Sequence, residues 1–462
     1  MNKKFFRLVS IIFFALLVIN PHMDAQSTSG WINLSDGKSL NGWRVLGGKA
    51  KFFVEHGTIV GTTVANTGNT FLCTEKEYGD FVLEADIYVE DPNGNSGLQT
   101  RSHYDPEGNN GKGKVYGRQC EVDPSPRKWT GGIYDEGRRD WLYPMSLNAN
   151  AQNAYKPDAF NHVKVECIGN EMKTWVNGIA CAYVVDTFDR KGFVGLQVHS
   201  IGSDVSKEGK KVIFKNIRIK TENLRPTPFE KNIYVLNLVP NSLNAYEKQN
   251  GWKLLFDGAT NSGWVSARNA TTFPAKGWKV NNGTIMVLAS DGKESQDGGD
   301  IVTKDEYSAF DLSFEFKLTH SANSGVKYFV TLKEKTGGSA IGLEYQVLDD
   351  TLHPDAKLGR DGDRTLASLY DLIPAKKQQR FTRPIGAWNI GRVVVYPNNK
   401  VEHYLNGVKV LEYVRGSKEF KDLVAISKYK IWEHFGEASQ GRILLQDHGN
   451  QVSFRSIKIR KL

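Results

Sequence analysis

Carboxylate and amide side chains alternate with apolar ones at the start of the segment 116–141, which reads YGRQCEVDPSPRKWTGGIYDEGRRDW. A β-strand here would place Gln119, Glu121 and Asp123 on one face and the apolar residues between them on the other. Such a face can pair with the hydroxyl array of a sugar, although half-exposed strands are polar on one face for structural reasons too. We therefore expect a polar ligand site on this strand.

The same segment continues with prolines and glycines, which predict a loop, and then with a dense cluster of aromatic and charged side chains. Arginine in this cluster could hold a carboxylate structurally or stabilise an oxyanion, and the sequence leaves both alternatives open. The cluster consists of Tyr134, Asp135, Glu136, Arg138 and Arg139.

A duplication of one whole domain relates the two halves of the chain, because several motifs recur in the same order far apart. The paired motifs are LSDGKSLNGW and LFDGATNSGW, GNSG and ANSG, IYDEG and LYDLI, WVNG and YLNG, LQVH and LQDH, and FKNIRIK and FRSIKIR. A solenoid would need a much shorter period, so we expect two domains of similar fold.

The alignment of the two copies exchanges an amide and a carboxylate. Gln119 corresponds to Glu344, and Glu121 corresponds to Gln346. Packing alone does not require this exchange. An amide beside a carboxylate can, however, pair with the hydrogen-bond donors and acceptors of sugar hydroxyl groups. A hydrogen-bonded pair across the duplicated interface is the alternative.

Other polar residues also recur. Each copy has a Tyr-Asp dipeptide and, near its end, a Gln-x-His motif whose two polar side chains would share a strand face. The histidine could act as an acid or a base, or it could be a satisfied structural residue. These residues are Tyr134, Asp135, Gln197 and His199 in the first copy and Tyr370, Asp371, Gln446 and His448 in the second.

One further strand pattern is specific to the first copy. Gln99, Arg101 and His103 follow each other at alternate positions, which predicts one shared face. The second copy has Lys327 and Phe329 at the places of Gln99 and Arg101, so the arginine has no cationic counterpart there. The substrate-binding candidates are therefore Gln99, Arg101, Gln119, Asp123, Arg138, Arg139, Gln197, Lys327, Gln346 and Gln446.

The sequence patterns around these residues predict antiparallel β-sheet. The stretches 80–90, 310–319, 162–169 and 392–397 alternate or are continuously apolar, and Asn-Gly pairs at 177–178 and 406–407 predict two-residue hairpins. Long amphipathic helical patterns are absent. We expect two jelly-roll β-sandwiches, at residues 26–222 and 251–462, joined by a proline-containing linker at 223–250 that packs partly against one domain.

The N-terminal residues 1–25 have the pattern of a secretory signal peptide, with basic residues before a short apolar run and a cut after Ala25. We expect an exported protein, located in the periplasm, and no later apolar run is long enough for a membrane helix. The formal charge of +9 is dispersed among acidic residues, which argues against nucleic-acid binding.

The four cysteines, Cys73, Cys120, Cys167 and Cys181, lie in the first half and are expected to be free, because four thiols in so long a chain are not a disulfide framework. No CxxC or HExxH spacing indicates a metal site, yet Asp, Glu and His could still hold a divalent metal. The sequence does not fix the oligomeric state.

The long motifs GRQCEVD, GGIYDEGRRDW, LEYQVLDD and AWNIGRVVVYPNNKVEHYLNGVKVLEY resemble the 3-keto-disaccharide hydrolase family, also described as 3-keto-glucoside 1,2-lyase and 3-keto-2-hydroxy-glucal hydratase. The resemblance covers nearly the whole chain after residue 25, as two tandem copies. It implies concanavalin-like jelly rolls and an enzyme that acts on an oligosaccharide or glycoside.

For a 3-keto-glycoside, the ketone acidifies the proton at C2, so a base can abstract it, the glycosidic oxygen leaves C1 and water then adds. Glu121 with His199, or Glu344 with His448, would be base and acid, while Arg101 or Arg138 would assist at an oxyanion. Direct hydrolysis by paired carboxylates is the mechanistic rival. The catalytic candidates are Glu121, Tyr134, Asp135, His199, Glu344, Tyr370, Asp371 and His448.

A non-catalytic glycan-binding protein with lectin-like sandwiches is the alternative function. The structure can discriminate between the two. A catalytic site should draw a carboxylate, a histidine and a tyrosine into one pocket, whereas a binding platform should expose aromatic side chains along an open groove.

Overall fold

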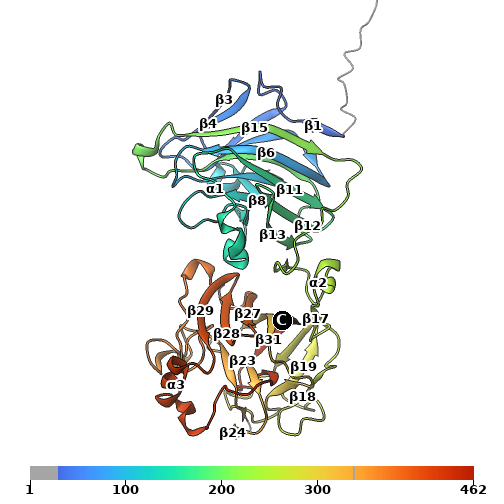
Figure 1. Ribbon diagram of the computed structural model, residues 1–462, viewed down its shortest axis with the longest axis vertical. Coiled ribbons are helices and arrows are strands. Elements are labelled where there is room, and N and C mark those ends of the chain that lie inside the picture. The colour runs from blue at the N-terminus through green and yellow to red at the C-terminus, as the bar shows by residue number, and fades with distance from the viewer. Residues whose placement is uncertain (1–29, 337–338) are drawn as a thin grey trace, which may run out of the picture.

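The computed structural model describes residues 30–336 and 339–462, which form two β-sandwiches. The first copy, blue to green, and the second, yellow to red, follow each other along the longest axis of the molecule (Figure 1). The fold class expected from the sequence, two tandem concanavalin-like jelly rolls of all-β type, is confirmed. The expected signal peptide at residues 1–25 lies outside the described residues.

The first copy packs a nine-stranded sheet against a seven-stranded sheet. The nine-stranded sheet has the order β16 (Leu236–Asn237), β13 (Ile179–Val185), β12 (Glu171–Val176), β11 (Asn161–Ile168), β6 (Phe81–Val89), β15 (Lys211–Lys220), β4 (Thr58–Thr62) and β3 (Lys51–Glu55), with β1 (Trp31–Asn33) beside β15. The seven-stranded sheet has the order β10 (Asp140–Tyr143), β9 (Ile133–Glu136), β8 (Lys114–Val122), β7 (Ser96–Asp105), β14 (Gly192–Val198), β5 (Thr70–Tyr78) and β2 (Trp43–Gly47).

The second copy has the same two layers with fewer strands. Its larger sheet has the order β19 (Trp278–Asn281), β20 (Thr284–Val287), β31 (Val452–Lys461), β22 (Phe310–Leu318), β27 (Asn389–Val395), β28 (Lys400–Leu405) and β29 (Val408–Val414), with β17 (Lys253–Leu254) beside β31. Its smaller sheet has the order β18 (Trp264–Ser266), β21 (Ile301–Thr303), β30 (Arg442–Leu445), β23 (Asn323–Val330) and β26 (Leu343–Leu348), and β24 (Lys335–Thr336) pairs with β25 (Ser339–Ala340).

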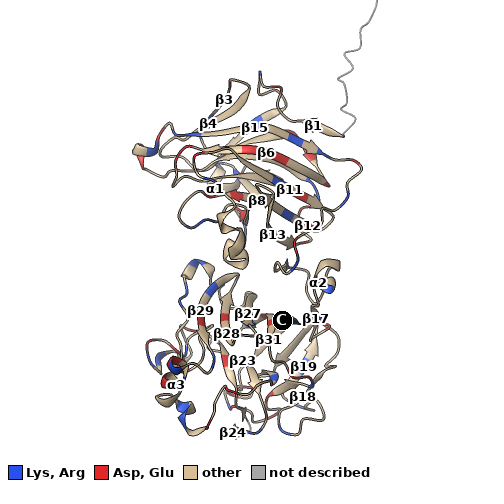
Figure 2. Ribbon diagram, viewed as in Figure 1, with Lys and Arg blue, Asp and Glu red and all other residues tan. Residues whose placement is uncertain are grey.

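Helices are short and lie in the connections. The α-helices are α1 (Gly108–Gly111), α2 (Ala245–Gln249) and α3 (Lys418–Ala425), and the 3₁₀ helices are η1 (Met145–Asn153), η2 (Val205–Lys207), η3 (Pro354–Lys357), η4 (Gln379–Phe381) and η5 (Lys428–Ile431). None of the helices in the described part of the chain is long and apolar enough to cross a membrane. Basic and acidic residues are interspersed over both copies (Figure 2).

Sequence alternation explains how the strands pack. On β6, Leu83, Ala85 and Ile87 are fully buried in the core, while the residues between them lie on the opposite face of the sheet. The predicted hairpin at Asn177 and Gly178 is confirmed, since both have positive φ, +50° and +81°, and join β12 to β13. The Asn406–Gly407 turn joins β28 to β29 in the same way. The four cysteines are buried and free, as expected.

The register of the strands agrees with the duplication. Gly97 on β7 pairs with Glu121 on β8, and Gly325 on β23 pairs with Gln346 on β26. The expectation of a loop throughout residues 124–141 is wrong in its second half, because β9 and β10 form a hairpin that extends the seven-stranded sheet. The side chains at 133–136 therefore alternate between two faces.

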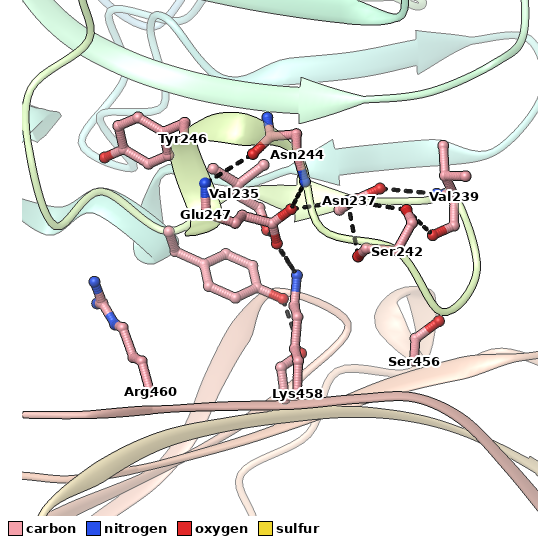
Figure 3. A network of polar contacts seen from close by, with 12 residues as sticks. Val235, Asn237, Val239, Ser242, Asn244, Tyr246, Glu247, Ser456, Lys458 and Arg460 are labelled. Atoms are coloured by element: carbon pink, nitrogen blue, oxygen red, sulfur yellow. Dashed lines mark hydrogen bonds and ion pairs between the residues drawn. The ribbon is translucent and has the colours of Figure 1, made fainter. Parts of the chain in front are cut away.

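The segment between the two copies is ordered by contacts to both of them. Its strand β16 runs parallel to β13 of the first copy, and α2 begins with a capping box at Asn244. From α2, the buried Glu247 accepts hydrogen bonds from Asn237 and from Lys458 of the second copy (Figure 3). This buried charged network fixes the second copy on the linker.

Apolar side chains of the second copy complete the core of the first. Phe381 is buried against Trp129, with ring centroids 5.8 Å apart, and Tyr404 belongs to the same cluster. Ser146 donates a hydrogen bond to the carbonyl of Gly407, 2.8 Å away. The two copies are thus docked by a continuous apolar contact rather than connected only by the chain.

Candidate active site

A cavity of about 450 Å³ opens in the first copy over the strands β8, β9 and β14. Its wall is more polar than apolar, which is typical of a site for a hydroxylated ligand. Six residues that the sequence singled out lie together in it: Gln119, Glu121, Asp123, Tyr134, Gln197 and His199.

Glu121 lies at the floor of this cavity and is 4% exposed. Its carboxyl group accepts hydrogen bonds from Asn95 Nδ2 at 2.5 Å and from Gln119 Nε2 at 2.9 Å. Burial raises the pKa of Glu121 to about 7, with the nearby Asp123 adding to the effect and the two hydrogen bonds opposing it. Glu121 is therefore a carboxyl group that changes its protonation state near neutral pH.

A second carboxyl group, Glu136, lines the same cavity; it belongs to the charged cluster seen in the sequence but not to the catalytic or substrate-binding candidates. It accepts hydrogen bonds from Asn69 Nδ2 at 3.3 Å and from Gln197 Nε2 at 3.4 Å. Burial and the charge of Glu121 raise the pKa of Glu136 to about 7. The period of two on β9 places Tyr134 and Glu136 on one face, and this was the signal that could have found it.

A bridge of amides connects the two carboxyl groups. Gln119 Nε2, which donates to Glu121, also lies 3.4 Å from Gln197 Oε1, and Gln197 in turn donates to Glu136. Gln99 Nε2 donates to Gln119 Oε1 at 2.9 Å, which fixes the orientation of the Gln119 amide. A Cβ atom at Gly97 would lie 2.3 Å from the Gln119 side chain, so glycine is required where this side chain crosses β7.

The paired carboxyl groups give the cavity acid and base chemistry at neutral pH. Because the charge of Glu121 raises the pKa of Glu136, the two groups titrate as a pair that holds about one proton near pH 7. One carboxylate can then accept a proton while the other carboxylic acid donates one.

His199 stands beside this pair as a neutral imidazole. Its Nδ1 lies 2.8 Å from the carbonyl oxygen of Ser200, which can only accept, so Nδ1 carries the proton and Nε2 is the free acceptor. Burial lowers the pKa of His199, which keeps the ring neutral. Of the roles that the sequence left open for His199, this arrangement suits that of a proton acceptor.

Donors surround the mouth of the cavity. Tyr134 Oη donates to Asp140 at 2.8 Å, and burial raises the pKa of Tyr134, so the phenol remains protonated. Arg127 pairs with Asp123 at 2.7 Å and lies over the ring of Trp141, 5.0 Å from its centroid. Arg127 can therefore donate to hydroxyl or carbonyl oxygens of a ligand, and Tyr134 Oη can accept from a ligand hydroxyl.

Both halves of the chain match one known protein family. The model of the 3-keto-α-glucoside-1,2-lyase-like domain matches residues 30–220 and again residues 251–460. The chain belongs to this family.

Relatives match about half of this chain each. A Bacteroides thetaiotaomicron protein named 3-keto-disaccharide hydrolase is 38% identical over 233 residues, which are 46% of this chain and 79% of that protein. A solved structure from Parabacteroides distasonis, described as a glycosyl hydrolase, is 29% identical with a TM-score of 0.40 and covers 48% of this chain and 99% of its own. Another solved structure from Parabacteroides distasonis is 26% identical, with a TM-score of 0.36. The match covers 46% of this chain and 100% of the chain in that structure.

Arg101 is not part of the cavity of the first lyase-like domain, and the expectation that it shares a face with Gln99 and His103 is wrong. A β-bulge lies between Thr100 and His103, and Arg101 has a positive φ of +47°, which turns its side chain to the other side of the sheet. Arg101 is 1% exposed there. Its guanidinium donates to the carbonyl oxygens of Gly79, Cys167 and Gly169 and to the carboxylate of Asp80. His103 instead pairs with Asp189.

Three members of the charged cluster, Asp135, Arg138 and Arg139, are also turned away from the cavity. Asp135 points to the opposite face from Tyr134 and is fully buried between Arg138 and Arg139. Arg138 also pairs with Asp189, and Arg139 with Asp186. Alternation on β9 therefore turns Asp135 away from the cavity of Glu121, and Arg138 and Arg139, in the turn between β9 and β10, pair with Asp135 on that side.

The second lyase-like domain does not repeat the carboxyl pair. Gln346 occupies the place of Glu121, and the register of β26 with residue 369 puts Leu372 at the place of Glu136. Glu344, at the place of Gln119, is 4% exposed, and burial raises its pKa. The exchange of amide and carboxylate thus leaves one carboxyl group at these strand positions. A second one, Glu294, comes from another segment, accepts from Gln446 as Glu136 accepts from Gln197, and raises the pKa of Glu344 further.

The other second-domain candidates have local partners. Tyr370 donates to Asp355, Asp371 pairs with Arg364, and Lys327 donates to Ser339 and to the carbonyl of Ala340. Gln446 Nε2 donates to Glu294 at 3.4 Å, and the rings of His448 and His353 are 5.7 Å apart. Within the described residues, no three His, Cys, Asp or Glu side chains are grouped as metal ligands would be.

Proposed function

We propose that the first domain is a carbohydrate-active enzyme that cleaves 3-keto-glycosides, with Glu121 and Glu136 as its acid and base. The observation that carries the proposal is the pair of carboxyl groups, both with pKa values near 7, in one cavity of about 450 Å³. Family membership and the name of the Bacteroides thetaiotaomicron relative supply the substrate class.

The chemistry requires two proton transfers, which the pair can perform together. The carboxylate removes the C2 proton, and the electron pair of that bond forms the enolate of the C3 ketone. The enolate expels the glycosidic oxygen from C1, and the carboxylic acid protonates this leaving oxygen. Water then adds to C1 and a proton returns to C2, so the two carboxyl groups recover their starting states and the net reaction is hydrolysis.

The surrounding residues have supporting roles in this proposal. The amide bridge of Gln119 and Gln197 holds the two carboxyl groups in one geometry. Arg127 can donate to the enolate or leaving-group oxygen. Tyr134, whose hydroxyl proton is donated to Asp140, can accept a hydrogen bond from a substrate hydroxyl. His199 Nε2 is a second acceptor, and it can take a proton from the attacking water.

The gathering of a carboxyl pair, a histidine and a tyrosine in one cavity favours an enzyme over a lectin-like module. Aromatic residues of the cavity, such as Trp141 at 4% exposure, are covered rather than displayed on an open groove. We also propose that the protein acts after export, because residues 1–25 have the composition of a signal peptide.

The test is turnover of a 3-keto-disaccharide by the chain lacking residues 1–25, with the released sugar measured by chromatography. Glu121→Gln and Glu136→Gln should each lower kcat by about 100-fold or more. Glu344→Gln in the second domain is the matched control and should keep activity. No turnover by the wild type, with binding of the unoxidised disaccharide, would refute the enzyme and favour glycan binding.

Reaction in D₂O separates elimination from direct hydrolysis. Elimination followed by hydration places deuterium at C2 of the released 3-keto sugar, which NMR detects, whereas direct displacement at C1 leaves C2 undeuterated. Incubation of the 3-keto product alone measures exchange that does not require cleavage.

A further inference from the structure

A second cavity, of about 410 Å³, lies between the two domains. Its first-domain wall comes from β10 and from the turn that contains Phe188, and its second-domain wall includes Arg383, Trp388 and Arg455. It shares Trp141 with the cavity of Glu121 and Glu136, but none of the residues with proposed catalytic roles lines it.

Arginines dominate the polar wall of this cavity. Arg138 and Arg139 are paired with buried aspartates, and Arg455 is paired with Glu315 at 2.8 Å. Arg383 differs from these three. No carboxylate lies within 4.0 Å of its guanidinium in the described part of the chain, and its side chain makes one hydrogen bond, from Nη2 to the carbonyl oxygen of Arg139 at 2.9 Å.

The charge of Arg383 is therefore only partly compensated. The side chain is half-buried, and burial lowers the pKa of Arg383; the charge of Asp140 opposes this effect and the like charge of Arg139 adds to it. A partly desolvated guanidinium is stabilised by an anion, which it can bind through two parallel N–H groups. Its Nε and Nη1 atoms have no hydrogen-bond partner among the described residues, so two donors remain available.

An apolar platform lies in the same cavity. Phe188 is 55% exposed, and the guanidinium of Arg139 lies over its ring at 4.6 Å from the centroid. An exposed aromatic ring beside an incompletely paired arginine matches a ligand with an apolar face and a negative charge. The C–H face and the acidic substituent of an acidic sugar combine these two properties.

We propose that the interdomain cavity binds an acidic sugar residue, with its carboxylate or sulfate at Arg383 and its ring against Phe188. The ligand would contact both domains, so it would stabilise their docking as well as occupy the cavity. This site is independent of the proposed cleavage reaction, because it uses neither Glu121 nor Glu136.

Isothermal titration with three probes, glucuronate, glucose and sodium sulfate, tests the proposal on the chain lacking residues 1–25. Glucuronate should bind and glucose should not. Arg383→Gln should raise the Kd of glucuronate by about tenfold or more, since a charge-assisted hydrogen-bonded pair is lost. Arg383→Lys, which keeps the charge without the planar fork, should give an intermediate Kd.

Two further variants separate the parts of the site. Phe188→Ala should weaken glucuronate but leave sulfate unchanged, because sulfate has no apolar face. Lys377→Gln is the control, since Lys377 lines a neighbouring cavity that Arg383 also borders, and it should change neither affinity. Absence of glucuronate binding, binding of sulfate alone, or an unchanged Kd in Arg383→Gln would each overturn the proposal.

Discussion

The substitution Glu121→Gln should abolish activity and at the same time stabilise the protein at alkaline pH. The pKa of Glu121 is raised from 4.5 to about 7 in the folded state, so the folded protein binds its proton more tightly than the unfolded chain. Below pH about 4.5 the carboxyl group is protonated in both the folded and the unfolded state, so its ionisation does not change the free energy of unfolding. Between pH about 4.5 and 7 the unfolded chain ionises this group while the folded state keeps its proton, so the free energy of unfolding falls over this range and the loss is complete above pH about 7.

The size of this loss follows from the change in pKa. A pKa raised from 4.5 to about 7 corresponds to about 3 kcal/mol at pH well above 7. The glutamine avoids this loss, but it gives up the charge-assisted hydrogen bonds from Asn95 and Gln119, which are worth about 1 kcal/mol net. Removal of the negative charge of Glu121 also lowers the pKa of Glu136, and this further raises the free energy of unfolding at alkaline pH.

The net gain for Glu121→Gln should be about 2 kcal/mol at pH 8.5, or about 3–6 °C in Tm, and close to zero at pH 5. Differential scanning calorimetry at both pH values measures it. Glu75→Gln, at an exposed carboxylate on β5, is the control and should show no pH-dependent gain. A variant that is no more stable than the wild type at pH 8.5 would refute the assignment of a strained, buried carboxyl group.

Three other substitutions test separate parts of the structure. Arg101→Gln should lower the free energy of unfolding, measured by urea denaturation, by about 3 kcal/mol, because the buried carbonyl groups and Asp80 lose their donor. The kcat of the folded variant, measured by steady-state kinetics, should stay unchanged. Phe381→Ala should cost about 3 kcal/mol by removing the ring that packs on Trp129, detected as a lower urea midpoint. Arg380→Ala should raise KM by about fivefold without a change in Tm, because this exposed second-domain residue lines the first-domain cavity; equal KM values would contradict a role for it.

The sequence predicts the repeated architecture well because local signals determine it. Alternation on β6 and β8 and the Asn-Gly turns depend on neighbouring residues alone, so they can be read without tertiary information. The polar face of β8 was found for the same reason, and Gln119, Glu121 and Asp123 do line one cavity.

The positions of the remaining site residues depend on structural features that the alternation of residues along a strand does not predict. A single β-bulge moves Arg101 from the expected face into a buried pocket of carbonyl oxygens. Glu136 was named in the charged cluster but not as a candidate, because the prolines and glycines before it indicated a loop. Instead, β9 continues the sheet, which turns Asp135 away from the cavity and Glu136 into it. Arg380 reaches the cavity from the other domain, which the sequence of the first copy cannot reveal.

The two domains differ at the positions where a pair of buried carboxyl groups lowers the free energy of unfolding. Two carboxyl groups with pKa values near 7 destabilise the folded protein at neutral pH and above, so they persist only where the surroundings hold them firmly. In the second domain, Gln346 and Leu372 occupy their places, and the buried carboxyl group of Glu344 has Lys327 and Lys428 nearby to offset part of its desolvation. That domain packs Phe381 on the first and extends Arg380 to its cavity, so it can stabilise and shape a site that it does not itself repeat.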